Sequence, residues 1–485
     1  MAFRRFIFIL CGFLFSVSVT GAVESKGKPS AAPAGKRPNI ILVMTDDQGW
    51  GDIGYNGHSA LKTPNLDAAA ASGLRLDRFY AAAPSCSPTR ASVLTGRHPN
   101  RMGVFSWGIP IRPQEITLAE VLKHQGYTTG HFGKWHLGAI RADSPVSPGA
   151  CGFDRWVSAS NYFDLNPEMS DQGRVVQLKG EGSIATVSTA IQWIREKATQ
   201  EAPIFAVIWF GSPHFPHHAA PEDAALYADQ PRKLREYYGE ITGVDRAFGL
   251  LRGELEALGI RENTLLWFNS DNGAMPVGDA GDARGGKHTV YEGGLRVPAF
   301  IEWPAGIPNP MSSPVRCSTT DIFPTILDVV GAGNSGPAVL DGISLVPLIR
   351  GKMDVRPVPL GFWNAGIPGH FTNPAGVVSK VLPTDEDWSE NKVERVTRRV
   401  EKIPKEKFPD DVFKGHSAWI SGDWKLHRFS AADGQKVKWT LFNLTNDPQE
   451  QRDLSEEFPE IVADLRVGME KWLASVVQSL RGADY

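Results

Sequence analysis

Charged and polar side chains follow several apolar segments of the chain, at the points where those segments end. In open α/β sheets, ligands bind beyond the carboxyl ends of the strands, so we expect these side chains to meet at one edge of a sheet. They are Asp46 and Asp47 after residues 39–44, Lys134 and His136 after 127–132, His214 after 204–210, and Asp271 and Asn272 after 264–268.

The oxygen-bearing members of this set are suited to binding a hard cation. Asp46, Asp47 and Asp271 offer carboxylates and Asn272 offers an amide oxygen, which are ligands that calcium prefers. Taken singly, each pair has a simpler interpretation, because Asp-Asp forms polar turns and Asn272-Gly273 is a turn signal. No cluster rich in nitrogen and sulfur donors indicates zinc.

Cys86 stands before a short predicted helix that has Pro88 in its first turn and Gly96 at its end. The N-terminus of a helix favours an anion. Arg90 keeps its proton and is suited to holding a hydroxyl or an oxyanion near Cys86. The alternatives are a small buried thiol for Cys86 and a surface ion pair for Arg90.

Alternating strands and helices must position these groups. The pattern predicts an α/β fold with a largely parallel sheet. A capping box at Thr117 and Glu120 and a cap at Thr63 mark two of the helices. The expected strands are residues 39–44, 127–132, 204–210, 264–268 and 297–303, and the expected helices are 64–73, 117–126, 184–197 and 233–258.

The last part of the chain has a different pattern. Residues 363–409 are rich in proline and charge and are interpreted as a linker or long loops. Antiparallel strands are expected over 418–429 and 439–444. We therefore predict a catalytic unit over residues 39–355 and a small α+β unit over 356–485. Apolar residues share one face of a final helix, namely Leu465, Met469, Trp472, Leu473, Val476 and Leu480.

The N-terminus is typical of an exported protein. Arg4 and Arg5 precede an apolar run over 6–19, small residues follow at 20–22, and residues 23–38 form a flexible leader. An uncleaved anchor is the alternative, but the run is shorter than the ~20 residues that a membrane span needs. We expect cleavage after the signal peptide 1–22, a mature chain without a span, and a periplasmic or secreted location.

Composition excludes some classes of function. The 485 residues carry a net charge of −3, so no overall basic field indicates nucleic-acid binding. Of the four cysteines, Cys11 falls in the signal peptide and Cys86 is assigned to chemistry. Cys151 and Cys317 either pair in an oxidising compartment or remain buried thiols.

Four segments carry a resemblance to a known family. Residues 86–96 read Cys-Ser-Pro-Thr-Arg-Ala-Ser-Val-Leu-Thr-Gly and resemble the signature of the formylglycine-dependent (type I) sulfatases. The other three are residues 133–138, the Ser-Pro-His of 212–214, and Gly-Lys at 286–287 with Glu-Gly-Gly-Leu-Arg-Val-Pro at 292–298. The resemblance spans about residues 39–473 and is greatest to the arylsulfatase A and N-acetylgalactosamine-6-sulfatase branch.

This resemblance implies a fold, a cofactor and a partner. The fold would be alkaline-phosphatase-like, with a large mixed, mainly parallel sheet flanked by helices and a smaller C-terminal α+β domain. A maturation enzyme would oxidise Cys86 to formylglycine, whose hydrated aldehyde attacks a sulfate ester. One calcium ion would lie on Asp46, Asp47, Asp271, Asn272 and the group derived from Cys86.

It also implies roles for the remaining residues. Lys134, His214 and Lys287 would contact the sulfate, with His214 or Lys287 as the acid for the leaving group. His136 would deprotonate the second hydroxyl of the nucleophile and so expel sulfate, because imidazole titrates near neutrality.

The aromatic residues Trp107, Tyr162 and Trp363 lie in segments predicted to be irregular and favour a sulfated carbohydrate as substrate, although core packing is their ordinary role. Two alternatives stay open. One is a phosphonate or phosphate ester hydrolase of the same superfamily. The other is a secreted, non-catalytic glycan-binding protein with an unmodified Cys86.

Overall fold

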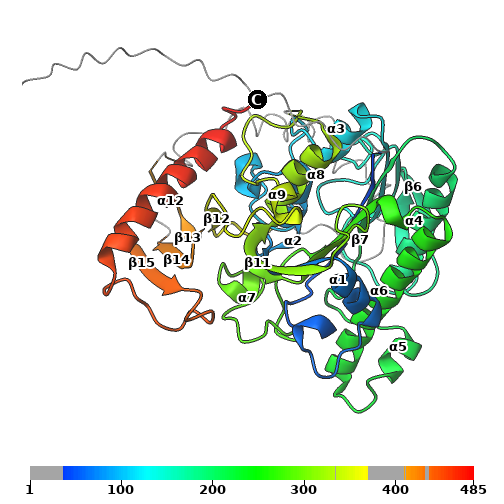
Figure 1. Cartoon of the computed structure of the whole chain (residues 1–485), viewed down its shortest axis with the longest axis horizontal. Helices are drawn as coiled ribbons and strands as arrows, with labels where there is room; N and C mark the ends of the chain where they lie inside the picture. Colours follow the sequence, from blue (N-terminus) through cyan, green and yellow to red (C-terminus); the bar gives the residue numbers. More distant parts are fainter. Residues whose placement is uncertain (1–36, 334, 370–408, 410, 432–435) are drawn as a thin grey trace, which may run out of the picture.

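The computed structural model describes residues 37–333, 335–369, 409, 411–431 and 436–485. The predicted signal peptide, the leader up to residue 36, and residues 370–408 of the predicted linker lie outside the described residues. Two sheets organise the described residues (Figure 1): a large one that begins at Asn39 and a four-stranded one near the C-terminus. The domain bounds 39–355 and 356–485 stay a prediction.

The large sheet is mixed, with a parallel centre. Its strand order is β11-β2-β10-β8-β1-β7-β3-β4-β5-β6, and β9 pairs with β2. The neighbours from β8 to β4 run parallel, whereas β10, β5 and β6 run antiparallel to their neighbours. The strands are β1 (Asn39–Thr45), β2 (Leu74–Tyr80), β3 (Thr128–Lys134), β4 (Arg155–Ala159), β5 (Glu168–Asp171), β6 (Arg174–Gln177), β7 (Ile204–Trp209), β8 (Thr264–Ser270), β9 (Arg296–Val297), β10 (Ala299–Glu302) and β11 (Met311–Ser318).

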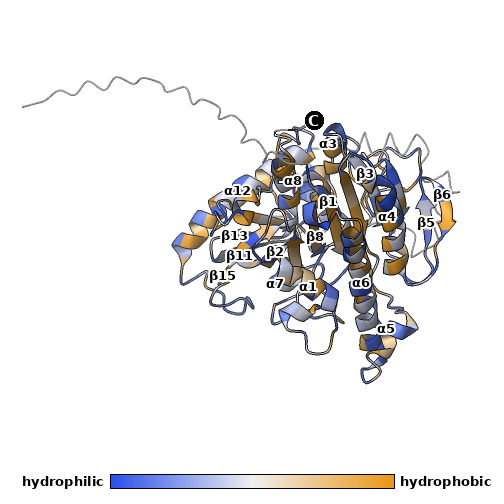
Figure 2. Cartoon of the chain, turned by 45° about the vertical axis from the view of Figure 1, so that its right-hand side comes forward, coloured by the Kyte–Doolittle hydropathy of each residue, from blue (hydrophilic) through white to orange (hydrophobic). Residues whose placement is uncertain are grey.

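Helices cover both faces of this sheet, and the central strands lie as an apolar layer between them (Figure 2). Alternate residues of β1 serve the two faces: Ile41 and Val43 pack with α1, α4 and α6, while Leu42 and Met44 pack with α2, α3 and α8. The helices are α1 (Pro64–Ser72), α2 (Cys86–Thr95), α3 (Leu118–His124), α4 (Gly182–Ala198), α5 (Pro221–Ala225), α6 (Arg232–Ala257), α7 (Glu292–Leu295), α8 (Ile322–Val330) and α9 (Val346–Ile349).

Most of the predicted elements are confirmed, and two details are corrected. The capping box of α3 is present, with reciprocal bonds between Thr117 and Glu120. Thr63 stands at the start of α1 without capping it, because its hydroxyl accepts from the Gly54 N–H and donates to Asp67. Residues 297–303 form parts of β9 and β10, which Pro298 separates.

The C-terminal unit is an antiparallel sheet covered by one long helix. Its order is β12 (Leu360–Asn364), β13 (Gly415–Ser421), β14 (Trp424–Ser430) and β15 (Val437–Asn443), and α12 (Pro459–Leu480) packs across it (Figure 1). The predicted single strand over 418–429 is therefore a hairpin, which turns at Gly422 with a φ of 55°. The apolar face predicted for the helix is confirmed, with Trp472 partly buried and its other members buried.

Two further expectations concern thiols and membranes. Cys151 and Cys317 are both buried and both free, so of the two alternatives the structure has separate thiols. Among the described residues, no helix combines the length and the apolar composition that a membrane crossing requires.

Candidate active site

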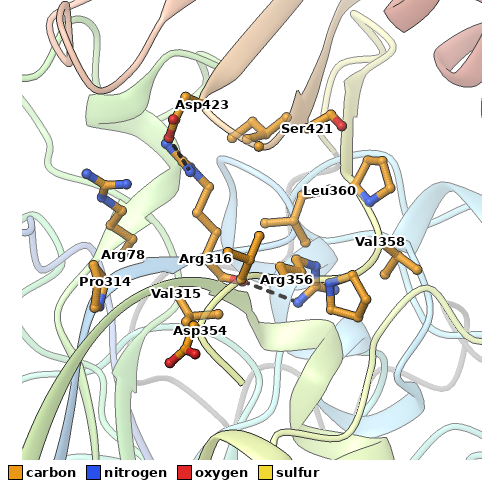
Figure 3. A pocket seen from close by; sticks show the side chains of 15 residues that line it. Arg78, Pro314, Val315, Arg316, Asp354, Arg356, Val358, Leu360, Ser421 and Asp423 are labelled. Atoms are coloured by element: carbon orange, nitrogen blue, oxygen red, sulfur yellow. Dashed lines mark hydrogen bonds and ion pairs between the residues drawn. The ribbon is translucent and has the colours of Figure 1, made fainter. Parts of the chain in front are cut away.

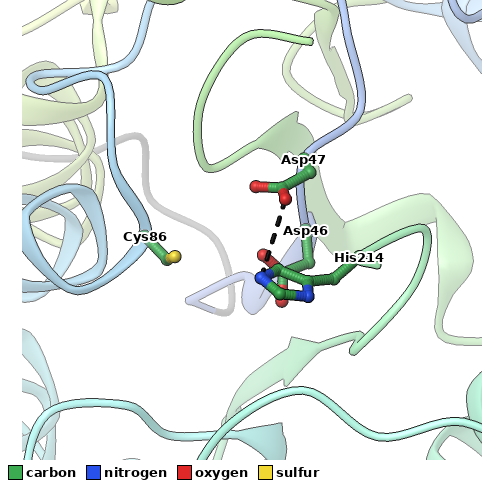
Figure 4. Close-up of side chains that lie close together, drawn as sticks. All are labelled: Asp46, Asp47, Cys86 and His214. Carbon is green, nitrogen blue, oxygen red and sulfur yellow. Dashed lines mark ion pairs between the residues drawn. The ribbon is translucent and has the colours of Figure 1, made fainter. Parts of the chain in front are cut away.

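The strand ends and the first turn of α2 converge on one buried cluster. Asp46 and Asp47 follow β1, His214 follows β7, and Cys86 is the first residue of α2. One ligand atom of each of these four residues lies within 4.8 Å of the others. Figure 4 shows the Cys86 side chain facing the two aspartates and His214. The predicted convergence at the carboxyl edge of the sheet is present.

Local backbone geometry explains why the chain turns at these points. Asp47 and His136 have φ values of 68° and 54°, in the left-handed region that a non-glycine residue seldom adopts. Gly133, near the end of β3, has a φ of 100°, and a Cβ atom there would lie 1.9 Å from the Trp209 carbonyl oxygen. Only glycine lets β3 approach β7 closely enough to place Lys134 and His136.

Three short ion pairs join described residues of the cluster. Lys134 Nζ lies 2.6 Å from Asp46 Oδ2, Lys287 Nζ lies 2.6 Å from Asp47 Oδ1, and an Arg90 guanidinium nitrogen lies 2.7 Å from Asp271 Oδ2. Three carboxylates thus face three cationic side chains. Arg90 is fully buried, which excludes a surface ion pair, and it also donates to the Lys134 carbonyl at 3.1 Å. Sequence reasoning placed these residues but missed their pairing.

Two oxygen atoms of the cluster accept no hydrogen bond from any described residue. They are Asp46 Oδ1 and Asn272 Oδ1, and both are buried. The amide nitrogen of Asn272 donates to Asp47 Oδ1 at 2.8 Å, which fixes the orientation of the amide. A buried acceptor without a donor costs about 1–3 kcal/mol. A cation beside these oxygens would remove that cost, so the two oxygen atoms fit the role of ligands to a hard metal ion.

Asp271 and His214 differ in how they join the cluster. Asp271 Oδ1 accepts from the Asp47 N–H at 3.1 Å, and Oδ2 accepts from Arg90, so both of its oxygens already have donors. A carboxylate has further lone pairs, so this does not remove it from a metal site. His214, for which the resemblance implies a contact with the substrate, is the fourth member of the group with Asp46, Asp47 and Cys86.

The His214 ring is held on two sides. Its Nδ1 lies 2.6 Å from the Phe215 carbonyl oxygen, and the Tyr162 ring stacks on it at a centroid distance of 4.4 Å. A carbonyl oxygen only accepts, so Nδ1 carries the proton. Burial lowers the pKa of His214 to about 3, against the opposing effect of Asp47. Tyr162 therefore lies at the cluster, whereas Trp363 belongs to β12 and the C-terminal core, which corrects its placement in a loop.

Burial dominates the pKa shifts of the other groups. It raises the pKa of the Cys86 thiol even though Lys134 and Lys287 lower it. It also lowers the pKa of His136 well below its usual range, and the charge of Lys134 adds to that effect. Burial and then Asp46 raise the pKa of Asp271 to about 6.

A separate pocket lies between β11 and the turn of the β13–β14 hairpin (Figure 3). Arg316 and Arg356 line it, but Arg316 lies 3.5 Å from Asp423 and Arg356 lies 2.7 Å from Asp321. These two cations thus have acidic partners, and the pocket contains none of the residues predicted to do chemistry.

Comparison with known proteins agrees with this geometry. The model of the family described as Sulfatase matches residues 38–332. N-acetylgalactosamine-6-sulfatase of Mus musculus is 33% identical over 369 residues, covering 68% of this chain and 69% of its own.

Two solved structures bear on the fold. That of Ps i-CgsB in complex with k-i-k-neocarrahexaose superposes with a TM-score of 0.73 and 25% identity, covering 90% of this chain and 93% of its own. Phosphonate monoester hydrolase of Agrobacterium radiobacter shares the fold, with a TM-score of 0.58 and 22% identity over 92% of this chain and 96% of its own. These likenesses confirm the alkaline-phosphatase-like fold. The chain therefore belongs to the sulfatase family and is a sulfuric ester hydrolase.

Proposed function

We propose that this enzyme hydrolyses sulfate esters of a sulfated carbohydrate, through a formylglycine nucleophile derived from Cys86 and with one bound calcium ion. The observation that carries the proposal is the convergence on Cys86 of carboxylates, cationic side chains and two buried oxygens that lack donors. A maturation enzyme would have to oxidise Cys86, and the N-terminal signal would export the chain.

Asp46, Asp47, Asp271 and Asn272 would hold the calcium, together with the oxygen introduced at Cys86. Without a metal, three carboxylates balance three cationic side chains, so the site has little net attraction for an anion. Calcium would add two positive charges and stabilise negative charge that develops on the reacting oxygens. The formylglycine would supply a hydrated aldehyde, one hydroxyl of which bonds to sulfur.

The protein's own side chains would bind and orient the sulfate. Asp46 and Asp47 hold the ammonium groups of Lys134 and Lys287 in place, so these cations are preorganised for sulfate oxygens. Arg90, fixed by Asp271 from within the protein, would orient the hydroxyls at residue 86. His136 would accept the proton of the hydroxyl that remains after the alcohol has left.

The two candidate acids for the leaving group differ in whether they have a proton available for it. His214 donates its Nδ1 proton to the Phe215 carbonyl, so a neutral ring has only an acceptor at Nε2. Lys287 carries protons at Nζ and lies in the same cluster. We therefore favour Lys287 as the acid, and we assign to His214 a contact with the leaving oxygen, whose proton Nε2 would accept in a hydrogen bond once the alcohol has formed.

A carbohydrate substrate is supported by two observations. Tyr162 stacks on His214 at the cluster and offers a ring on which a sugar can pack. The relatives include an N-acetylgalactosamine-6-sulfatase and a structure in complex with neocarrahexaose. The phosphonate hydrolase alternative rests on likeness of fold, and no residue of the cluster favours it.

The nucleophile can be tested by mass. Trypsin releases residues 79–90 as one peptide, and its mass distinguishes cysteine from formylglycine. We expect conversion and turnover in protein produced with a maturation enzyme, and neither in Cys86→Ala. Turnover by protein whose Cys86 is fully unmodified would contradict the proposal.

A further inference from the structure

A second buried ionic network lies where the C-terminal sheet meets the large unit. Lys425 Nζ lies 2.9 Å from Glu292 Oε1 and 3.0 Å from Glu450 Oε1, and the His427 ring bonds to the same Glu450 oxygen at 2.6 Å. Tyr80 donates to the other oxygen of Glu292 at 2.9 Å. All five side chains are buried.

The C-terminal sheet has two faces, and this network belongs to the inner one. Leu426 packs under α12, whereas Lys425 and His427 point to the opposite face, because side chains alternate along a strand. On that face Ala418 and Ile420 pack against Tyr80 and the segment that carries α7. Lys425 and His427 are thus polar groups in an otherwise apolar contact.

Glu450 contacts both ends of one loop. Its carboxylate accepts from the Glu292 N–H at 2.6 Å, and its carbonyl accepts from Arg284 at 3.0 Å. The Tyr291 ring stacks on the His427 ring at a centroid distance of 4.9 Å, and the Arg284 guanidinium carbon lies 4.2 Å from the centroid of the Tyr291 ring. Glu450 makes these contacts with a φ of 54°, a conformation that a non-glycine residue holds only when its surroundings fix it.

The middle of this loop, residues 284–292, carries Lys287. The Lys287 N–H donates to the Ala274 carbonyl at 2.9 Å, and the His288 N–H donates to the Pro84 carbonyl at 2.8 Å, two residues before Cys86. The loop therefore connects the active-site cluster on one side with Glu450 on the other.

We propose that Glu450 is a positioning residue, through which the C-terminal unit holds the loop 284–292 so that Lys287 Nζ reaches the sulfate. This rests on the proposed function of Lys287. Stability alone does not explain the network, because apolar residues of similar volume often stabilise such a contact as well or better. What the charged groups supply is a fixed geometry at both ends of the loop.

The test is a double-mutant cycle on the matured full-length enzyme, with 4-nitrophenyl sulfate as the probe. Glu450→Gln removes the charge with little change of shape, and we expect kcat/KM to fall about tenfold, since misplacement by about 1 Å can cost up to about 100-fold. In a Lys287→Ala background the same change should have less than about a twofold effect, because coupled residues are non-additive. Asp453→Asn is the matched control. Asp453 binds the Leu441 and Ser455 N–H groups without contacting the loop, so this variant should keep full activity.

Equal losses from Glu450→Gln in both backgrounds would overturn the proposal, because a general structural role acts independently of Lys287. If Glu450→Gln does not fold, Arg284→Met takes its place, since Arg284 is exposed and its loss removes one bond of the loop to Glu450. If Lys287→Ala retains full activity, the role proposed for Lys287 is itself wrong. If Lys287→Ala is impaired and Glu450→Gln is not, only the positioning role is wrong.

Discussion

Two buried ionic networks in this chain look alike in composition and differ in completeness. Around Cys86, carboxylates and cationic side chains surround Asp46 Oδ1 and Asn272 Oδ1, which have no donor. Around Lys425, no buried side-chain oxygen or nitrogen of Glu292, Glu450 or His427 lacks a partner among the described residues.

This difference separates a ligand-binding site, the cluster around Cys86, from a structural joint, by which we mean the Lys425 network that connects the C-terminal sheet to the large unit. A complete network has nothing left to offer a ligand, so it can only hold its surroundings in place. An incomplete one retains an energetic cost that a bound cation or substrate can remove. We therefore expect changes in the Cys86 cluster to affect turnover first, and changes in the Lys425 network to affect the geometry and stability of the fold.

The largest expected effect is that of Cys86→Ala. Loss of the nucleophile should reduce sulfate release at least about 10⁴-fold, as for other enzymes that lose a nucleophile. The free energy of unfolding, measured in urea, should change little, because the thiol is small and its removal leaves the ion pairs in place. Cys151→Ala, at a buried thiol elsewhere, should keep full activity. If Cys86→Ala is stable and releases sulfate as fast as the wild type, the cluster around Cys86 is not the site of turnover.

The next effect concerns stability. Lys425→Met leaves Glu292 and Glu450 buried without their cation, and removing one partner of a buried pair costs about 3–5 kcal/mol. Urea denaturation of the wild type and the variant measures this loss. A change below about 1 kcal/mol would show that the Lys425 network is not the joint described here.

Calcium should act on one network only. At 100 times its dissociation constant, an ion that binds only the folded state adds about 2.7 kcal/mol to the free energy of unfolding. Thermal unfolding in calcium or in EGTA measures this, and Asp46→Asn should abolish the difference. Glu450→Gln should retain it. Equal stability with and without calcium in the wild type would contradict the assignment of the metal.

A separate effect is a pH dependence at a third kind of buried carboxyl. Asp52 accepts from the Gly49 and Asp279 N–H groups and from Tyr237, without an ion pair among the described residues. Burial raises its pKa from 3.8 to about 7, so it stabilises the fold fully below pH 3.8 and this contribution is lost as the pH rises through about 7.

Asp52→Asn should therefore flatten the pH dependence of stability between about pH 4 and 7, by up to about 1.4 kcal/mol per pH unit. Urea denaturation of wild type and variant at several pH values measures the slope. Identical slopes would show that Asp52 keeps its charge in the folded protein despite its burial.

The parts of the fold that a local sequence pattern determines could be predicted from the sequence. β7 is apolar throughout, and β1 and β8 have uninterrupted apolar runs at their centres, which is typical of strands buried on both faces. The polar residues after these runs mark the edge of the sheet. Elements without such a signature were missed. β2 alternates half-buried polar residues with apolar ones, and β11 contains Pro314, so neither resembles a central strand.

Pairing at long range was beyond sequence reasoning as well. Arg90 and Asp271 are 181 positions apart, and Lys287 and Asp47 are 240 apart, so no periodicity relates them. The same holds for Glu292 and Glu450, 158 positions apart, which meet only because two sheets pack together. Residue types at strand ends predicted which groups gather at the site, and the fold alone determines their partners.

The most direct measurement is sulfate release by the matured enzyme from a panel of 2-O-, 4-O- and 6-O-sulfated mono- and oligosaccharides, with aryl sulfate and phosphonate esters alongside. We predict release from one sulfated sugar well above the aryl ester, and none from the phosphonate. Release from the phosphonate ester alone, by protein in which Cys86 is shown to be converted, would contradict the account.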